Sequence, residues 1–154
     1  MKMILFGLLF AAVSSSAYAG LETLNGNFQS GPEQGAGCYA EFQIRVRQIA
    51  NNEIVEFVSF FKNSETGTTS ENVFKVFESI NKGWVPWRYD WGDGIATGSQ
   101  ITTFEGTQLK NKIKVGLLGL RQLSLSLALE GSILTTTSTD TGSTPVVCKY
   151  HKHN

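Results

Sequence analysis

The chain has 154 residues, and its 13 Lys and Arg side chains balance 13 Asp and Glu side chains. A near-neutral chain lacks the basic field that drives binding to phosphate backbones, so we expect no nucleic-acid partner. After residue 19, no stretch is long and apolar enough to predict a membrane-spanning helix.

Residues 1–19 predict a cleaved secretory signal. Lys2 forms the positive start, Ile4 to Val13 form a short apolar run, and Ala17-Tyr18-Ala19 is a small-x-small cleavage site. The run is about half of the roughly 20 residues that a membrane anchor needs. Residues 20–154 then have the size of one domain, which we expect in the periplasm or secreted.

Two cysteines, Cys38 and Cys148, lie in the part expected to be exported. In an oxidising compartment, such an isolated pair is most simply a disulfide. The bond would close a loop of about 110 residues, worth on the order of 4–5 kcal/mol by chain entropy. The alternative is a pair of free thiols or metal ligands, although the pair has no C-x-x-C spacing.

The chain after Cys38 reads as strands. The sequence CYAEFQIRVR alternates small or apolar residues with polar ones, which is typical of a half-buried strand, and EIVEFVSFF is β-branched and aromatic. Residues 71–81 are ambiguous. They are consistent with a helix capped by Ser70, but the prevalence of Val and Phe favours a strand.

Five further strands are expected after the tryptophan-rich stretch, over residues 98–104, 109–115, 120–130, 132–139 and 145–150. In one of them lysines alternate with apolar residues, which predicts a solvated lysine face. In another, Leu123, Leu125, Leu127 and Leu129 share one face and Arg121 lies at its open end.

Seven or eight strands joined mostly by short turns predict an all-β antiparallel meander. Closure into a small barrel would remove two unpaired edges, and it would place the first and last strands, and so the two cysteines, side by side. The predicted fold is therefore a closed barrel with one disulfide, and a two-sheet sandwich is the alternative.

The stretch GWVPWRYDWGDG holds Trp84, Trp87 and Trp91, together with Arg88 and Tyr89. Pro86 and the following glycines limit any helix to one or two turns, so the stretch is predicted to be a loop at a barrel end. Its indoles either plug the core or form an exposed platform, because Trp, Tyr and Arg are frequent in binding hot spots.

Catalytic and metal-binding residues are scarce. Both histidines, His151 and His153, lie in a terminal tail, and no third ligand accompanies their H-x-H spacing. Asp90 and Asp93 lack the spacing of a calcium loop and are read as turn caps. We therefore expect no cofactor, no metal and no enzyme activity, with a hydrolase based on these two carboxylates as the least favoured alternative.

The segment Leu24-Asn25-Gly26-Asn27-Phe28 resembles the Gly-x-Trp opening of the first strand in calycin-type barrels, the lipocalins and avidins, with Phe28 in place of the tryptophan. The expected architecture is also similar in kind to the periplasmic inhibitors of proteases and lysozymes, which are small exported barrels with one disulfide. These resemblances imply a small binding barrel.

The sequence thus predicts an exported, non-catalytic binding protein that uses Trp84, Trp87, Arg88, Tyr89 and Trp91 at the barrel mouth, with Arg121 beneath. Its partner would be a small apolar or aromatic ligand if the barrel is hollow. If the barrel is filled, an envelope protein recognised by the loop is expected, as for an enzyme inhibitor.

Overall fold

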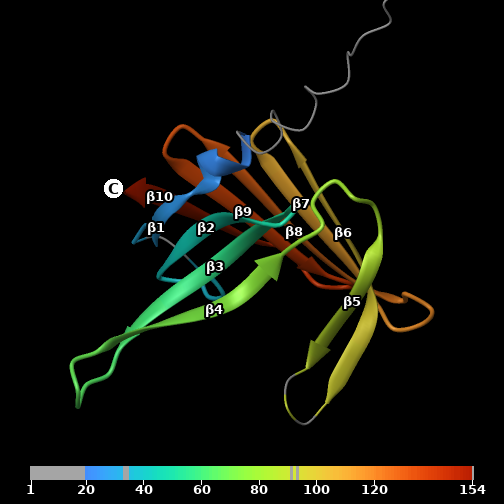
Figure 1. Cartoon of the computed structure of the whole chain (residues 1–154), viewed down its shortest axis with the longest axis horizontal. Coiled ribbons are helices and arrows are strands. Elements are labelled where there is room, and N and C mark those ends of the chain that lie inside the picture. Colours follow the sequence, from blue (N-terminus) through green and yellow to red (C-terminus); the bar gives the residue numbers. More distant parts are fainter. Residues whose placement is uncertain (1–19, 33–34, 91, 93, 154) are drawn as a thin grey trace, which may run out of the picture.

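The computed structural model describes residues 20–32, 35–90, 92 and 94–153. The predicted signal, residues 1–19, lies outside them. The described residues form a short 3-10 helix, η1 (Glu22–Leu24), and ten strands (Figure 1). The strands are β1 (Gly26–Ser30), β2 (Glu41–Ile49), β3 (Asn52–Lys62), β4 (Thr69–Phe77), β5 (Val85–Asp90), β6 (Ile95–Glu105), β7 (Gln108–Val115), β8 (Arg121–Glu130), β9 (Ile133–Asp140) and β10 (Val146–His153). Across this part of the chain, no helix has the length and apolar character needed to cross a membrane.

All ten described strands belong to one antiparallel sheet with the order β4-β3-β2-β1-β10-β9-β8-β7-β6-β5. The last strand, β10, pairs with β1, which therefore separates it from β2, the strand after Cys38 that was expected to be its neighbour. The strands form one sheet rather than the two of a sandwich. The sheet differs from the expected barrel in two respects. It has ten strands instead of seven or eight, and its two edges, β4 and β5, do not pair with each other.

The connection from β4 to β5 accounts for this opening, because it is bound to β6. The Asn81 backbone N–H donates to the Thr102 carbonyl at 2.8 Å, and the Asn81 side-chain oxygen accepts the Phe104 N–H at 2.9 Å. Ser79 and Asn81 have positive φ angles of 57° and 59°, so the chain turns along β6 instead of folding β5 directly back onto β4. β5 consequently pairs with β6 alone.

Aromatic rings fill the space beneath β1, β2, β3 and β10. The ring centroid of Phe42 lies 5.7 Å from that of Phe28, 5.4 Å from that of Phe57 and 4.7 Å from that of Tyr150. All four side chains are buried, as the alternation in β2 predicts for Phe42. Such ring pairs contribute about 0.5–1.5 kcal/mol each beyond the burial of apolar area, so this packed region is the main core.

The predicted disulfide is confirmed. Cys38, in the connection after β1, is bonded to Cys148 in β10, and their Cα atoms are 5.8 Å apart. Cys148 is buried at the edge of the aromatic core. The bond therefore fixes the β1–β2 connection against the last strand, in the middle of the sheet and away from both unpaired edges.

Of the ambiguous residues 71–81, most form a strand, as favoured, but the prediction for the tryptophan-rich stretch is wrong. Residues 69–77 form β4, whereas Val85 to Asp90, expected to be a loop, form β5. In a helix, a spacing of three such as that between Trp84 and Trp87 would place both indoles on one face. On an extended chain, the same spacing places these two indoles on opposite faces.

Candidate ligand-binding cavity

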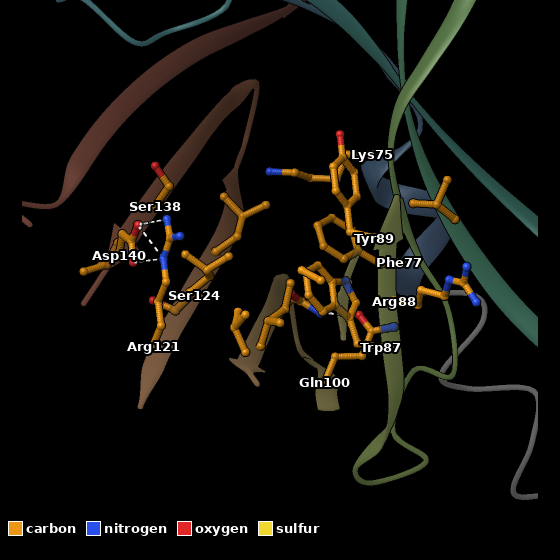
Figure 2. Close-up of a pocket in the computed structure, with 18 of the residues that line it drawn as sticks. Lys75, Phe77, Trp87, Arg88, Tyr89, Gln100, Arg121, Ser124, Ser138 and Asp140 are labelled. Carbon is orange, nitrogen blue, oxygen red and sulfur yellow. Dashed lines mark hydrogen bonds and ion pairs between the residues drawn. The ribbon is translucent and has the colours of Figure 1, made fainter. Parts of the chain in front are cut away.

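A cavity of about 1060 Å³ lies where the sheet edges fail to pair. One wall comes from β4 and β5, and the other comes mainly from β7, β8 and β9, as Figure 2 shows. The side chains that the close-up labels on the β8–β9 wall are Arg121, Ser124, Ser138 and Asp140. The curvature of the sheet and the missing β4–β5 pairing thus together create an open, hollow region.

Apolar side chains make up much of the lining. Phe77 and Trp87 come from the first wall, and Ile113, Leu123 and Leu125 come from the second. The predicted leucine face of β8 is therefore divided. Leu127 and Leu129 are buried in the core, whereas Leu123 and Leu125 border the cavity.

Three polar side chains replace hydrophobic ones on the inner face of β6 and β7. Gln100, Thr102 and Asn111 are all buried, and the Asn111 amide donates to Thr102 Oγ1 at 2.9 Å and to Gln100 Oε1 at 3.4 Å. Gln100 and Asn111 line the cavity. The sequence did hold a signal for this cluster, because Asn111 occupies an apolar position between the outward lysines of LKNKIKV.

Lys75 is a cavity residue that the sequence analysis missed. Phe57 pairs with Lys75 and Val58 pairs with Val73, so Phe74 is an extra residue in β4 and forms a β-bulge. A bulge places two residues opposite one, and here it turns both Phe74 and Lys75 toward the inside of the sheet. Figure 2 shows the Lys75 side chain directed toward the opposite wall.

Burial lowers the pKa of the Lys75 ammonium below its usual 10.5. Among the described residues, no ion pair includes Lys75. The other charged residues that line the cavity are Glu78, Arg88, Arg121 and Asp140. The Arg88 and Arg121 side chains are 66% and 64% exposed, whereas Lys75 is half-buried, so Lys75 is the most buried of the cations in the lining.

Arg121 lines the cavity, as predicted for a residue at the open end of the leucine face, but its charge is already neutralised. Its Nε donates to Asp140 Oδ1 at 3.1 Å, and its Nη2 donates to Asp140 Oδ2 at 2.5 Å. The hydrogen bonds from Arg121 lower the pKa of the Asp140 carboxyl. An acidic ligand would therefore have to compete with Asp140 for the Arg121 guanidinium.

The structure separates the other predicted site residues. Trp87 and Tyr89 line the cavity with nearly parallel rings, 6.3 Å between centroids. Arg88 contributes to the lining, but its side chain points away from the cavity in Figure 2. Trp84 lies outside the lining and is 46% exposed, and Trp91 falls outside the described residues. Neither of the two described indoles is a buried plug.

Asp90 acts as the turn cap that the sequence predicted, since its Oδ1 accepts the Gly92 N–H at 2.9 Å. Asp93, its proposed partner, lies outside the described residues. Within the described part of the chain, no group of three or more His, Cys, Asp or Glu side chains is arranged to hold a metal ion.

No protein-family model matches the chain, and no curated protein matches its sequence. The fold is similar to secretory abundant heat soluble protein 4 from Ramazzottius varieornatus, with 14% identity and a TM-score of 0.49 over 94% of this chain and 100% of that one. It is also similar to the REP1-NXSQ fatty acid transporter, with 13% identity and a TM-score of 0.47 over 86% of this chain and 98% of that one. At these low values, neither match indicates what this chain binds.

Proposed function

We propose that this calycin-like chain is a non-catalytic binding protein that holds a small, largely apolar molecule in the cavity. The supporting observation is the cavity of about 1060 Å³, lined by apolar side chains with a few polar groups among them. Binding sites for small molecules typically have this mixture and reach about 1,000 Å³. A hollow interior favours such a ligand over the alternative of a filled barrel that inhibits an enzyme through a loop.

Lys75 refines the chemistry of the ligand. An ammonium group partly removed from water, with no described ion-pair partner, is stabilised by a ligand that supplies a negative charge or strong acceptor. Trp87, Leu123 and Leu125 offer the apolar surface beside it. The proposed ligand is therefore an apolar molecule with one acidic group.

Binding of the neutral probe N-phenyl-1-naphthylamine, which fluoresces in apolar surroundings, tests whether the cavity takes up ligand. We expect a saturable rise in emission that Trp87→Ala weakens by about tenfold and that Leu125→Trp, whose larger side chain takes up part of the cavity beside the probe, also weakens. Trp84→Ala is the matched control, because Trp84 lies outside the lining. Unchanged binding by Leu125→Trp would place the probe elsewhere.

Competition between dodecanoic acid and dodecanol tests the role of Lys75 separately. The acid should displace the probe at lower concentration than the alcohol, and Lys75→Met should remove that preference while the neutral probe still binds. Equal displacement by both competitors would eliminate the acidic ligand but leave the apolar cavity intact.

The export of the chain remains part of this proposal. A disulfide between Cys38 and Cys148 is most stable in an oxidising compartment, which fits a periplasmic or secreted protein. The test is N-terminal sequencing of the protein recovered from the periplasm or the medium. The mature chain should begin at Gly20, and recovery only from the cytoplasm with residues 1–19 attached would exclude export.

A further inference from the structure

The connection between β7 and β8 exposes three leucines at once. We call Gly116–Leu120 the leucine loop. Leu117 is 102% exposed, and Leu118 and Leu120 are each 79% exposed. Single exposed leucines are common on protein surfaces, but three within five residues are unusual, and clustered exposed apolar side chains are typical of an interaction site.

Backbone hydrogen bonds keep the leucine loop in this shape. The Gly116 N–H donates to the Thr97 carbonyl at 2.8 Å, and the Gly119 N–H donates to the Gly116 carbonyl at 3.3 Å. Gly116 and Gly119 have positive φ angles of 77° and 59°, a conformation that glycine adopts without strain. The leucines are therefore presented by a defined turn.

A row of cations leads to this loop along the outer face of β7. Lys110, Lys112 and Lys114 are all exposed. Their partners across β6 are Thr103, Ile101 and Ser99, and their partners across β8 are Ser126, Ser124 and Gln122. Every one of these cross-strand neighbours is uncharged, so the lysine row is not neutralised within the sheet.

Trp84 lies beside the same row. The Lys114 ammonium is 4.5 Å from the centroid of the Trp84 ring, and the Lys114 stem lies next to Gly119 of the leucine loop. Exposed leucine, an indole at the boundary and lysines behind them are the combination found on surfaces that lie in the interface of a bilayer. Protein interfaces, in contrast, are depleted of lysine.

We propose that the leucine loop inserts into the surface of a bilayer with anionic headgroups, and that the lysine row of β7 contacts those headgroups. The leucines would enter the boundary of the acyl chains, and the lysine stems would extend along the membrane with their ammonium groups at the phosphates. Val115 and Arg121, which flank the loop, also line the cavity, so docking brings one cavity wall to the membrane. The docking itself does not depend on the proposed ligand.

Sedimentation with lipid vesicles tests the proposal. The whole mature protein should bind vesicles of phosphatidylcholine with about one-third phosphatidylglycerol, bind pure phosphatidylcholine much more weakly, and dissociate at high salt. Replacing Leu117, Leu118 and Leu120 together by serine should reduce the partition coefficient by at least about tenfold. Replacing each lysine of the row by glutamine should reduce it by about fivefold, on the anionic vesicles only.

Val147→Ser is the control, because Val147 is 54% exposed on β10, outside the loop and the row. It should leave vesicle binding unchanged. Circular dichroism should confirm that the triple serine variant folds, since the replaced side chains are exposed. Absence of binding to anionic vesicles, or full binding by the folded triple variant, would overturn the proposal. If wild type instead remains off the vesicles and forms a dimer that the triple variant loses, the loop is a self-association surface.

Discussion

The packed region beneath β1, β2, β3 and β10 and the hollow region between β4–β5 and β7–β9 belong to one sheet, but they differ in what fills them. Phe42 in the packed region is surrounded by aromatic rings, whereas Leu125 in the hollow region borders the cavity. Along β8 the change occurs within one strand, between Leu125 and Leu127. The same alternation of apolar and polar residues can thus build a packed core or line a cavity, depending on whether side chains from other strands pack against the apolar face.

This contrast indicates that the packed and hollow regions have different roles. The disulfide and the aromatic cluster fix the middle of the sheet, and the two unpaired edges lie at its far ends. Stability should therefore depend mostly on the packed region, and ligand binding should depend on the hollow one. Four measurements of stability test the first of these two expectations.

The largest effect is expected from removing the disulfide. Replacing Cys38 and Cys148 together by serine releases a cross-link across a sequence separation of 110 residues. The chain-entropy treatment predicts a loss of about 4–5 kcal/mol in the free energy of unfolding, measured in guanidinium chloride. A loss below about 1 kcal/mol would show that the bond contributes little to the stability of the packed region.

A pair of truncations compares the two regions directly. Phe42→Ala should reduce the free energy of unfolding by about 3–5 kcal/mol, because it empties a well-packed aromatic site. Leu125→Ala should cost about 1–2 kcal/mol, since its side chain is only partly buried at an existing cavity. Equal losses in urea unfolding would refute the division between a packed and a hollow region.

Lys75→Met should stabilise the protein at neutral pH. Burial lowers the pKa of Lys75 in the folded state, so the unfolded chain binds more protons and stability rises with pH between the folded pKa and 10.5. The advantage of the methionine variant should therefore shrink as pH approaches 10.5. The midpoint of denaturant unfolding measures it, with Lys112→Met on the exposed outer face as the control. A variant less stable at neutral pH would contradict this account.

The smallest effect is expected from Asp140. Its folded pKa lies below 3.8 because Arg121 donates hydrogen bonds to it, so its contribution to stability is present above about pH 4 and disappears as pH falls through the folded pKa. The pair is exposed, and Asp140→Asn should be only slightly less stable at neutral pH. Thermal unfolding at pH 7 and at successively lower pH below 3.8 should show that difference shrink.

Local alternation predicted the strands well. The register of Phe42, Ile44 and Val46, the lysine row of β7 and the leucine face of β8 all follow the period of two. The cysteine pair correctly indicated a disulfide to the last strand, although β1 lies between β2 and β10. These features depend on short-range patterns or on one covalent constraint. They could therefore be predicted without knowledge of distant contacts.

The opening of the sheet and the composition of the site could not be predicted in this way. The missing β4–β5 pairing depends on Asn81 binding to β6, which is a long-range contact. The entry of Lys75 into the cavity depends on a bulge at Phe74, and nothing in NVFKVF marks a bulge. Val85 to Asp90 were predicted to be a loop because of Pro86 and the nearby glycines, whereas their pairing with β6 is a contact that the local sequence does not reveal.

The two unpaired edges also bear on the tendency of the protein to aggregate at high concentration. An exposed edge strand is a template on which another chain can add a strand, and this is a common route to aggregation. β5 is only six residues long, Pro86 within it has no N–H to offer, and Arg88 and Asp90 place charges along it. β4 is interrupted by its bulge. Both unpaired edges are therefore poor templates for polymerisation.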